Sequence, residues 1–187
     1  MKAAEVYRVL RGELAPWLQE RQFKRQGSSG LVLVRALKAM NQVLWFQCDR
    51  RGWDPYAGSS FFVNLGLSPT PVANFDNSVR LNELLTDDEL ALALDYHNAI
   101  VQRLRPPPES YFTMMAGQFS RYPSGAGMLQ ALRDQFQPRR EPFQRNQDFS
   151  LRYYAPGDVA GWAQFMKAPL DRAFAQTAPS GQGGVNG

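Results

Sequence analysis

The sequence predicts one α+β domain, in which helices pack on an antiparallel sheet of three to five strands. The first observation is the segment 61–67, in which every second residue is apolar, as in a strand with one buried face. The second is a pair of apolar runs, at 31–37 and 43–49, that precede this segment. The third is a set of helix-period apolar patterns on either side of the three runs. We therefore expect a three-strand meander on which the helices are laid.

The length and composition fit a single domain. The chain has 187 residues, of which 44% are hydrophobic and 12% aromatic, and this is enough to bury one core. We expect the domain to cover residues 1–176 and to be followed by a flexible Gly/Ser-rich tail over 177–187. The one cysteine, Cys48, excludes an internal disulfide and fits a reducing compartment.

The first helix is expected over residues 4–21, where Pro16 should kink or divide it. A turn at 27–30 then leads into the three predicted strands. The apolar side chains expected to form the stripe of this helix are Val6, Leu10, Leu14, Trp17 and Leu18.

The clearest helix signal begins at Thr86. Thr86 and Glu89 have the spacing of a capping box, in which each side chain accepts a hydrogen bond from the other residue's backbone N–H. The helix should end before the three prolines at 106–108. Its apolar stripe is expected to contain Leu90, Leu94, His97, Val101 and Leu104.

The remaining elements have weaker signals. Residues 111–119 are apolar without a clear period, and a short helix is expected after Ser124. Alternation over 149–154 predicts a fourth strand. Asp158 is expected to cap a last helix, which Pro169 should end or kink.

Several short motifs together resemble a family of small bacterial proteins that is catalogued as a domain of unknown function. The shared features are a helix ending in a Phe-Lys-Arg element, a meander, and a strand of the form Phe-x-Val-Asn-x-Gly. The resemblance implies an α+β fold and brings no catalytic residues with it. The residues that carry it are Leu18, Phe23, Lys24, Arg25, the strand 44–47, Phe61, Val63, Asn64, Gly66 and Trp162.

Charge and hydropathy restrict the location of the protein. The formal net charge is +4, but residues 76–95 contain six acidic residues and one arginine, a local charge of −5. No opening segment has the pattern of a signal peptide, and no run approaches the roughly 18 apolar residues of a membrane span. We expect a cytoplasmic protein without a membrane partner.

Few residues have a pattern that predicts catalysis, and we expect no catalytic residue, metal or cofactor. His97 lies on an apolar helix stripe and is expected to be a hydrogen-bonded core histidine. Cys48 is expected to be a buried, unreactive thiol, although Arg50 shares its strand face. Asp87, Asp88 and Glu89 could bind Mg²⁺, but consecutive acids at a helix start more often favour the helix dipole.

One face of the predicted sheet could hold a ligand. By alternation, Trp45, Gln47 and Asp49 share a face with Asn64, opposite the core residues. An aromatic platform with a few polar groups is typical of ligand sites. The alternatives are that a second helix covers this face or that it is solvated.

Two function classes follow, and an enzyme ranks third. The first is a non-catalytic protein-binding module, for example an immunity protein that neutralises a cognate toxin. Its partner-binding residues would be the acids of the segment 76–95, namely Asp76, Glu83, Asp87, Asp88, Glu89 and Asp95.

The second class is nucleic-acid binding through the arginine-rich C-terminal half. There Arg139, Arg140, Arg145 and Arg152, together with Arg133, would contact phosphates. The interleaved Phe136, Phe143 and Phe149 would stack on bases. Three acids, Asp134, Glu141 and Asp148, would dilute the attraction to nucleic acid.

Overall fold

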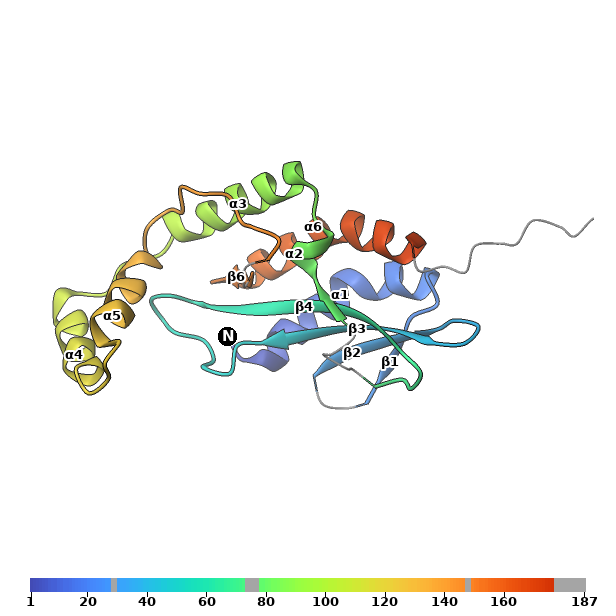
Figure 1. Ribbon diagram of the computed structural model, residues 1–187, viewed down its shortest axis with the longest axis horizontal. Helices are drawn as coiled ribbons and strands as arrows, with labels where there is room; N and C mark the ends of the chain where they lie inside the picture. Colours follow the sequence, from blue (N-terminus) through green and yellow to red (C-terminus); the bar gives the residue numbers. More distant parts are fainter. Residues whose placement is uncertain (28–29, 73–77, 147–148, 177–187) are drawn as a thin grey trace, which may run out of the picture.

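The computed structural model describes residues 1–27, 30–72, 78–146 and 149–176. Over these residues the chain forms the predicted α+β fold, with helices packed on one antiparallel sheet (Figure 1). The predicted tail, residues 177–187, lies outside the described residues. The elements in chain order are α1 (Ala3–Glu20), β1 (Lys24–Gln26), β2 (Leu31–Ala36), β3 (Asn41–Cys48), β4 (Ser59–Ser68), β5 (Ser78–Arg80), α2 (Leu81–Leu84), α3 (Asp87–Gln102), α4 (Glu109–Phe119), α5 (Gly125–Asp134), β6 (Leu151–Tyr153) and α6 (Pro156–Gln176).

The predicted meander forms the centre of the sheet. Within the described residues the strand order is β1–β2–β3–β4–β5. Strand β6 also pairs with β4, at residues 59–61, whereas β5 pairs with residues 64–66. The long pair β3–β4 places Phe46 opposite Val63 and Leu44 opposite Leu65. The fourth strand predicted near residue 150 is β6, and it pairs antiparallel with β4. The strands β1 and β5 were not predicted, because neither Lys24–Gln26 nor Ser78–Arg80 belongs to an apolar or alternating run.

The main core lies between one sheet face and the two long helices α1 and α6, which pack against each other (Figure 1). The predicted stripe of α1 is confirmed, since Val6, Leu10, Leu14 and Leu18 are buried and Trp17 is half-buried. The helix continues through Pro16 without division. From the sheet, the main core contains Leu31, Leu33, Leu44, Phe46, Phe61, Val63 and Leu65, and from α6 it contains Val159, Trp162, Ala163, Met166, Leu170, Ala173 and Phe174.

Local hydrogen bonds explain where the later helices begin. Thr86 Oγ1 accepts from the N–H of Glu89 at 3.2 Å, and Glu89 Oε2 accepts from the N–H of Thr86 at 2.9 Å, so the predicted capping box is confirmed. In α6, Asp158 accepts at 2.8 Å from the backbone N–H groups of Tyr154 and Ala155, which precede the helix. Pro169 does not end α6, because the helix runs on to Gln176.

The ambiguous segment 111–119 belongs to α4. Helices α4 and α5 form a hairpin at one end of the molecule, beyond the ends of the central strands (Figure 1). The hairpin has a smaller apolar cluster of its own, built on Leu104, Phe112 and Phe136. Its position creates a cleft between the hairpin and the end of the sheet, as described below.

Candidate functional site

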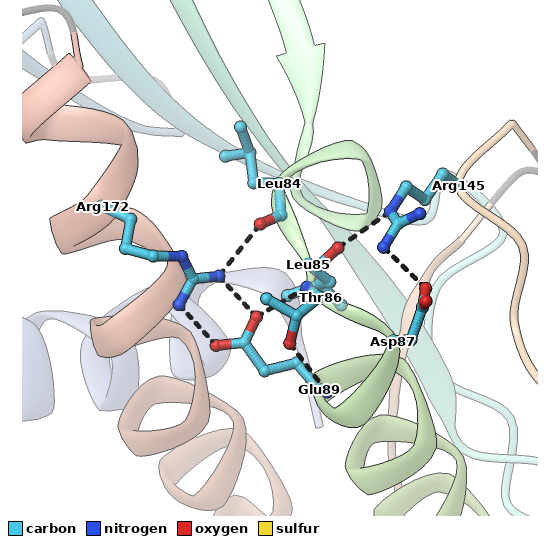
Figure 2. Close-up of polar contacts among 7 residues, drawn as sticks. All are labelled: Leu84, Leu85, Thr86, Asp87, Glu89, Arg145 and Arg172. Carbon is cyan, nitrogen blue, oxygen red and sulfur yellow. Dashed lines mark hydrogen bonds and ion pairs between the residues drawn. The ribbon is translucent and has the colours of Figure 1, made fainter.

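The acidic residues at the start of α3 are partly engaged in ion pairs within the protein (Figure 2). Glu89 forms a two-pronged pair with Arg172 of α6, at 2.7 Å to Nη1 and 2.5 Å to Nη2. Arg172 Nη2 also donates to the carbonyl of Leu84 at 3.1 Å. The hydrogen bonds from Arg172 hold the pKa of Glu89 below its usual value, so its charge is used to join α3 to α6.

Asp87 is also paired (Figure 2). Its Oδ1 accepts from Arg145 Nη2 at 2.7 Å, and Arg145 Nε donates to the carbonyl of Leu85 at 2.9 Å. A residue predicted to bind a protein partner and a residue predicted to bind nucleic acid therefore contact each other. Both side chains are exposed, so the pair contributes little stability but reduces the local field of both charges.

The other predicted partner-binding acids divide into two kinds. Glu83 accepts from the N–H of Arg80 at 2.8 Å and so helps to start α2. Asp76 lies outside the described residues. Asp88 and Asp95 are exposed on α3, and neither forms an ion pair with any residue that the structure describes.

The outer face of α3 combines these two acids with an exposed leucine. Leu92 is 58% exposed and lies outside the apolar stripe of its helix. It lies four residues after Asp88 and three before Asp95, so the three side chains share one face of the helix. We call Asp88, Leu92 and Asp95 the α3 ridge.

The predicted ligand face of the sheet does not form one open surface. Trp45 and Asn64 are cross-strand neighbours, as the alternation predicted, but both are buried. Trp45 packs with Val34 and Val43 in a small apolar cluster. Gln47 and Asp49 are only half-buried, so these two remain accessible while the aromatic platform does not.

The side chains proposed for nucleic-acid binding are used mostly inside the protein. Phe136, Phe143 and Phe149 are buried, so they cannot stack on bases as that hypothesis requires. Arg139 lies over the ring of Phe143 at 4.8 Å. Arg140 is exposed, and Arg152 is buried. The expectation of a basic stripe with interleaved stacking aromatics is therefore wrong for the aromatics, because the core of this region is made from them.

A cleft of about 650 Å³ lies between the sheet end and the α4–α5 hairpin. It brings together Asp49, His97 and Arg152, which the sequence placed in three separate hypotheses. The hairpin contributes its apolar wall. The residues that line it are Asp49, Arg51, Gly52, Asp54, Ala57, Gly58, Ser59, Ser60, His97, Tyr111, Met115, Phe119, Met128, Leu132, Gln135, Ser150 and Arg152.

His97 differs from the predicted hydrogen-bonded core histidine. Its ring meets Phe143 edge-on with a centroid distance of 5.4 Å, so the packing expectation is right. Its Nδ1 is buried and has no hydrogen-bond partner among the described residues. Burial, with the positive charges of Arg152 and Arg139, lowers the pKa of His97 to about 4, and the ring is neutral at pH 7.

Cys48 is half-buried, and burial raises the pKa of its thiol, as expected of an unreactive cysteine. Within the described residues, no three His, Cys, Asp or Glu side chains are grouped to hold a metal ion, and Asp87, Asp88 and Glu89 are not such a group. None of the helices described here is long and apolar enough to cross a bilayer.

Comparison of the chain with protein-family models, with curated proteins and with solved structures gives no match. The resemblance to a small bacterial family stays a prediction. Several residues of interest were not singled out from the sequence, among them Arg172, Tyr111, Met115 and Leu92. Leu92 was detectable in principle, because it falls outside the predicted apolar stripe of its helix.

Proposed function

We propose that this chain is a non-catalytic protein-binding module of the kind found in immunity proteins, which neutralise a cognate toxin by covering its active site. The observation that carries the proposal is the α3 ridge. Its exposed leucine offers a partner an apolar contact, and its two acids, which have no ion-pair partner among the described residues, would orient a basic partner.

The ridge favours a basic partner. Asp88 and Asp95 are exposed and have no ion-pair partner among the described residues, whereas Asp87 and Glu89 are paired with arginines of the same chain. The proposed acidic surface is therefore narrower than the six residues suggested by the sequence. A toxin that acts on nucleic acid or nucleotides through a cleft lined by Arg or Lys would suit it, and the cytoplasm is the proposed place of the encounter.

The experiment begins with the product of the gene next to this one in its native genome. We expect that product to stop growth when expressed alone and growth to return when this protein is co-expressed. Association rates measured with purified proteins should then fall for Asp88→Lys and Asp95→Lys, by a factor that shrinks as salt is added. Leu92→Ala should instead speed dissociation.

The matched control is Glu141→Lys, which reverses an exposed acid outside the ridge. It should leave both rates unchanged. If growth is rescued but none of the three ridge substitutions changes the association or dissociation rate, the α3 ridge is not the docking surface. If this protein neither neutralises that gene product nor binds any other protein partner, the proposal itself is wrong.

The contacts do not favour the nucleic-acid alternative, because Arg145 is paired with Asp87 and the phenylalanines are buried. We expect only weak binding that falls steeply with salt and shows little sequence preference. A nanomolar, sequence-selective complex at physiological salt would reverse the ranking.

A further inference from the structure

The cleft between the sheet end and the α4–α5 hairpin has the construction of a small-molecule site. Its volume of about 650 Å³ falls within the range of ligand pockets, roughly 300–1,000 Å³. One wall is apolar and comes from the hairpin, with Met115, Phe119, Met128 and Leu132. The opposite side is polar and comes from strand ends and the loop before β4.

Arg152 is the most deeply buried charge in this cleft. It is 8% exposed, and among the residues that the structure describes no carboxylate lies within ion-pair distance of it. Its Nε and Nη2 donate to the carbonyl of Ala57 at 3.1 and 2.9 Å, and its Nη1 donates to the carbonyl of Gln135. A guanidinium has five N–H donors, so Nη1 and Nη2 each retain one N–H that no described residue accepts.

Asp49 and Asp54, the acids that line the cleft, form no ion pair with Arg152, although Asp54 attracts its charge from beyond ion-pair distance. Asp54 Oδ1 accepts at 2.8 Å from the N–H groups of Tyr56 and Ala57, which fixes the loop. Asp49 Oδ1 accepts from the N–H of Arg51 at 2.9 Å. Both acids are half-buried, and each is directed at backbone N–H groups of its own loop. With His97 neutral, the buried end of the cleft is positive while its acids lie nearer the solvent.

We propose that this cleft binds a small amphipathic carboxylate, with its carboxylate on the free N–H groups of Arg152 and its apolar group against the methionine wall. A buried cation that already holds two carbonyls is costly to leave without a counter-ion, and a planar carboxylate matches the fork of its remaining donors. Methionine side chains adapt to apolar groups of different shape, which suits such a wall. The proposal is independent of the protein-binding function, because the α3 ridge does not line the cleft.

The test uses three probes with one skeleton: 3-phenylpropionate, 3-phenylpropanamide and 3-phenylpropylamine. Binding to the full chain is followed by NMR of ¹³C-labelled methionine methyl groups. The chain has six methionines, and Met115 and Met128 line the cleft whereas Met114 does not. We expect saturable shifts of the Met115 and Met128 methyls with the carboxylate, and binding at least tenfold weaker for the amide and the amine.

Two matched variants separate the cleft from the rest of the hairpin. Met128 and Met114 are both partly exposed, at 39% and 52%, so the fold should tolerate a change at either. Met128→Glu places a negative charge in the wall and should weaken the carboxylate at least tenfold, while Met114→Glu should leave its affinity unchanged. Arg152→Gln should abolish binding, but it also removes hydrogen bonds to Ala57 in the loop and to Gln135, which follows α5. If the Arg152→Gln variant does not fold, the comparison of Met128→Glu with Met114→Glu decides.

Three outcomes would overturn the proposal. One is equal or tighter binding of the amide or the amine. Another is that Met128→Glu and Met114→Glu behave alike. The third is that none of the three probes shifts the Met115 and Met128 methyls in a saturable way.

Discussion

Buried charged residues fix the junctions between elements of this protein. Asp158 is almost fully buried, and its carboxylate accepts from two backbone N–H groups and pairs with Arg103, the residue that directly follows α3. Each bond is charge-assisted, which offsets the cost of removing the carboxylate from water. One side chain therefore joins the end of α3, the end of β6 and the start of α6.

The central strand pair supplies the first prediction at the residue scale. Leu65 is 5% exposed and lies opposite Leu44 inside the main core. Leu65→Ala should lower the free energy of unfolding by about 2–5 kcal/mol, measured by urea denaturation, because it removes buried methyl groups and leaves a cavity. Leu92→Ala, at an exposed position, should change it by less than about 0.5 kcal/mol and serves as the control. Equal effects at the two positions would contradict the assigned burial.

His97 supplies the second prediction. Its pKa is lowered from 6.5 to about 4, so between these values the unfolded chain binds a proton that the folded protein does not. Stability should therefore fall as the pH falls from 6.5 to 4, with a contribution from His97 on the order of 3 kcal/mol.

The measurement is urea unfolding of the wild type and His97→Gln at a series of pH values. Carboxylates also titrate below pH 5, so only the difference between the two curves reports His97. The variant should have the flatter pH dependence over this window. If the free energy of unfolding has the same pH dependence in both proteins, the His97 imidazole is protonated as readily in the folded state as in the unfolded chain.

At the scale of elements, α3 and α6 approach each other closely at Gly161. A methyl group on this residue would overlap the ring and hydroxyl of Tyr96, whose hydroxyl donates to the carbonyl of Asp158 at 3.0 Å. Tyr96 also meets Trp162 edge-on at 4.5 Å. The glycine is thus required by packing and not by its backbone conformation.

Two glycine-to-alanine substitutions test this packing. Alanine is the better helix former by about 1 kcal/mol, so Gly12→Ala, at an exposed position in α1 with open space around it, should stabilise the protein. Gly161→Ala should instead destabilise it by about 1–3 kcal/mol, because the tyrosine must move. In a Tyr96→Ala background the cost of Gly161→Ala should disappear, and a persistent cost would point to another contact. Thermal or urea unfolding of the four variants measures all of these effects.

At the scale of the whole molecule, the buried apolar residues that the structure describes form a large core and two smaller clusters. The large core lies between the sheet and the helices α1 and α6, one small cluster surrounds Trp45, and the other holds the α4–α5 hairpin to the loop before β4. A small cluster with exposed helices around it opens more readily than a central sheet.

Hydrogen exchange should resolve the two parts. Amides of β3 and β4 should exchange only by global unfolding, and amides of α4 and α5 should exchange through a local opening of lower free energy. The carboxylate proposed for the cleft should slow exchange in the hairpin, since the hairpin forms its wall. Uniform protection across both parts would show that the hairpin and the sheet unfold as one unit.

The sequence by itself determined the elements that have a clear apolar period or a capping pair. Alternation over residues 61–67 identified the central strand, a four-residue spacing identified the core face of α1, and the Thr86–Glu89 pair located the start of α3. These features depend on neighbours along the chain, so the α+β class and most of the core followed from them. The short strands β1 and β5 and the apolar helix α4 have no such period, and their structure depends on distant partners.

Only the tertiary structure decided which polar residues are available to a ligand or partner. Asp87, Glu89 and Arg145 look like free surface charges in the sequence, yet each has a partner at a distant position. Arg152 and His97 come together from separate elements at the cleft, beside methionines of the hairpin. The physical reason is that ion pairs and cavities form between side chains far apart in sequence, whereas capping and periodicity act within a few residues.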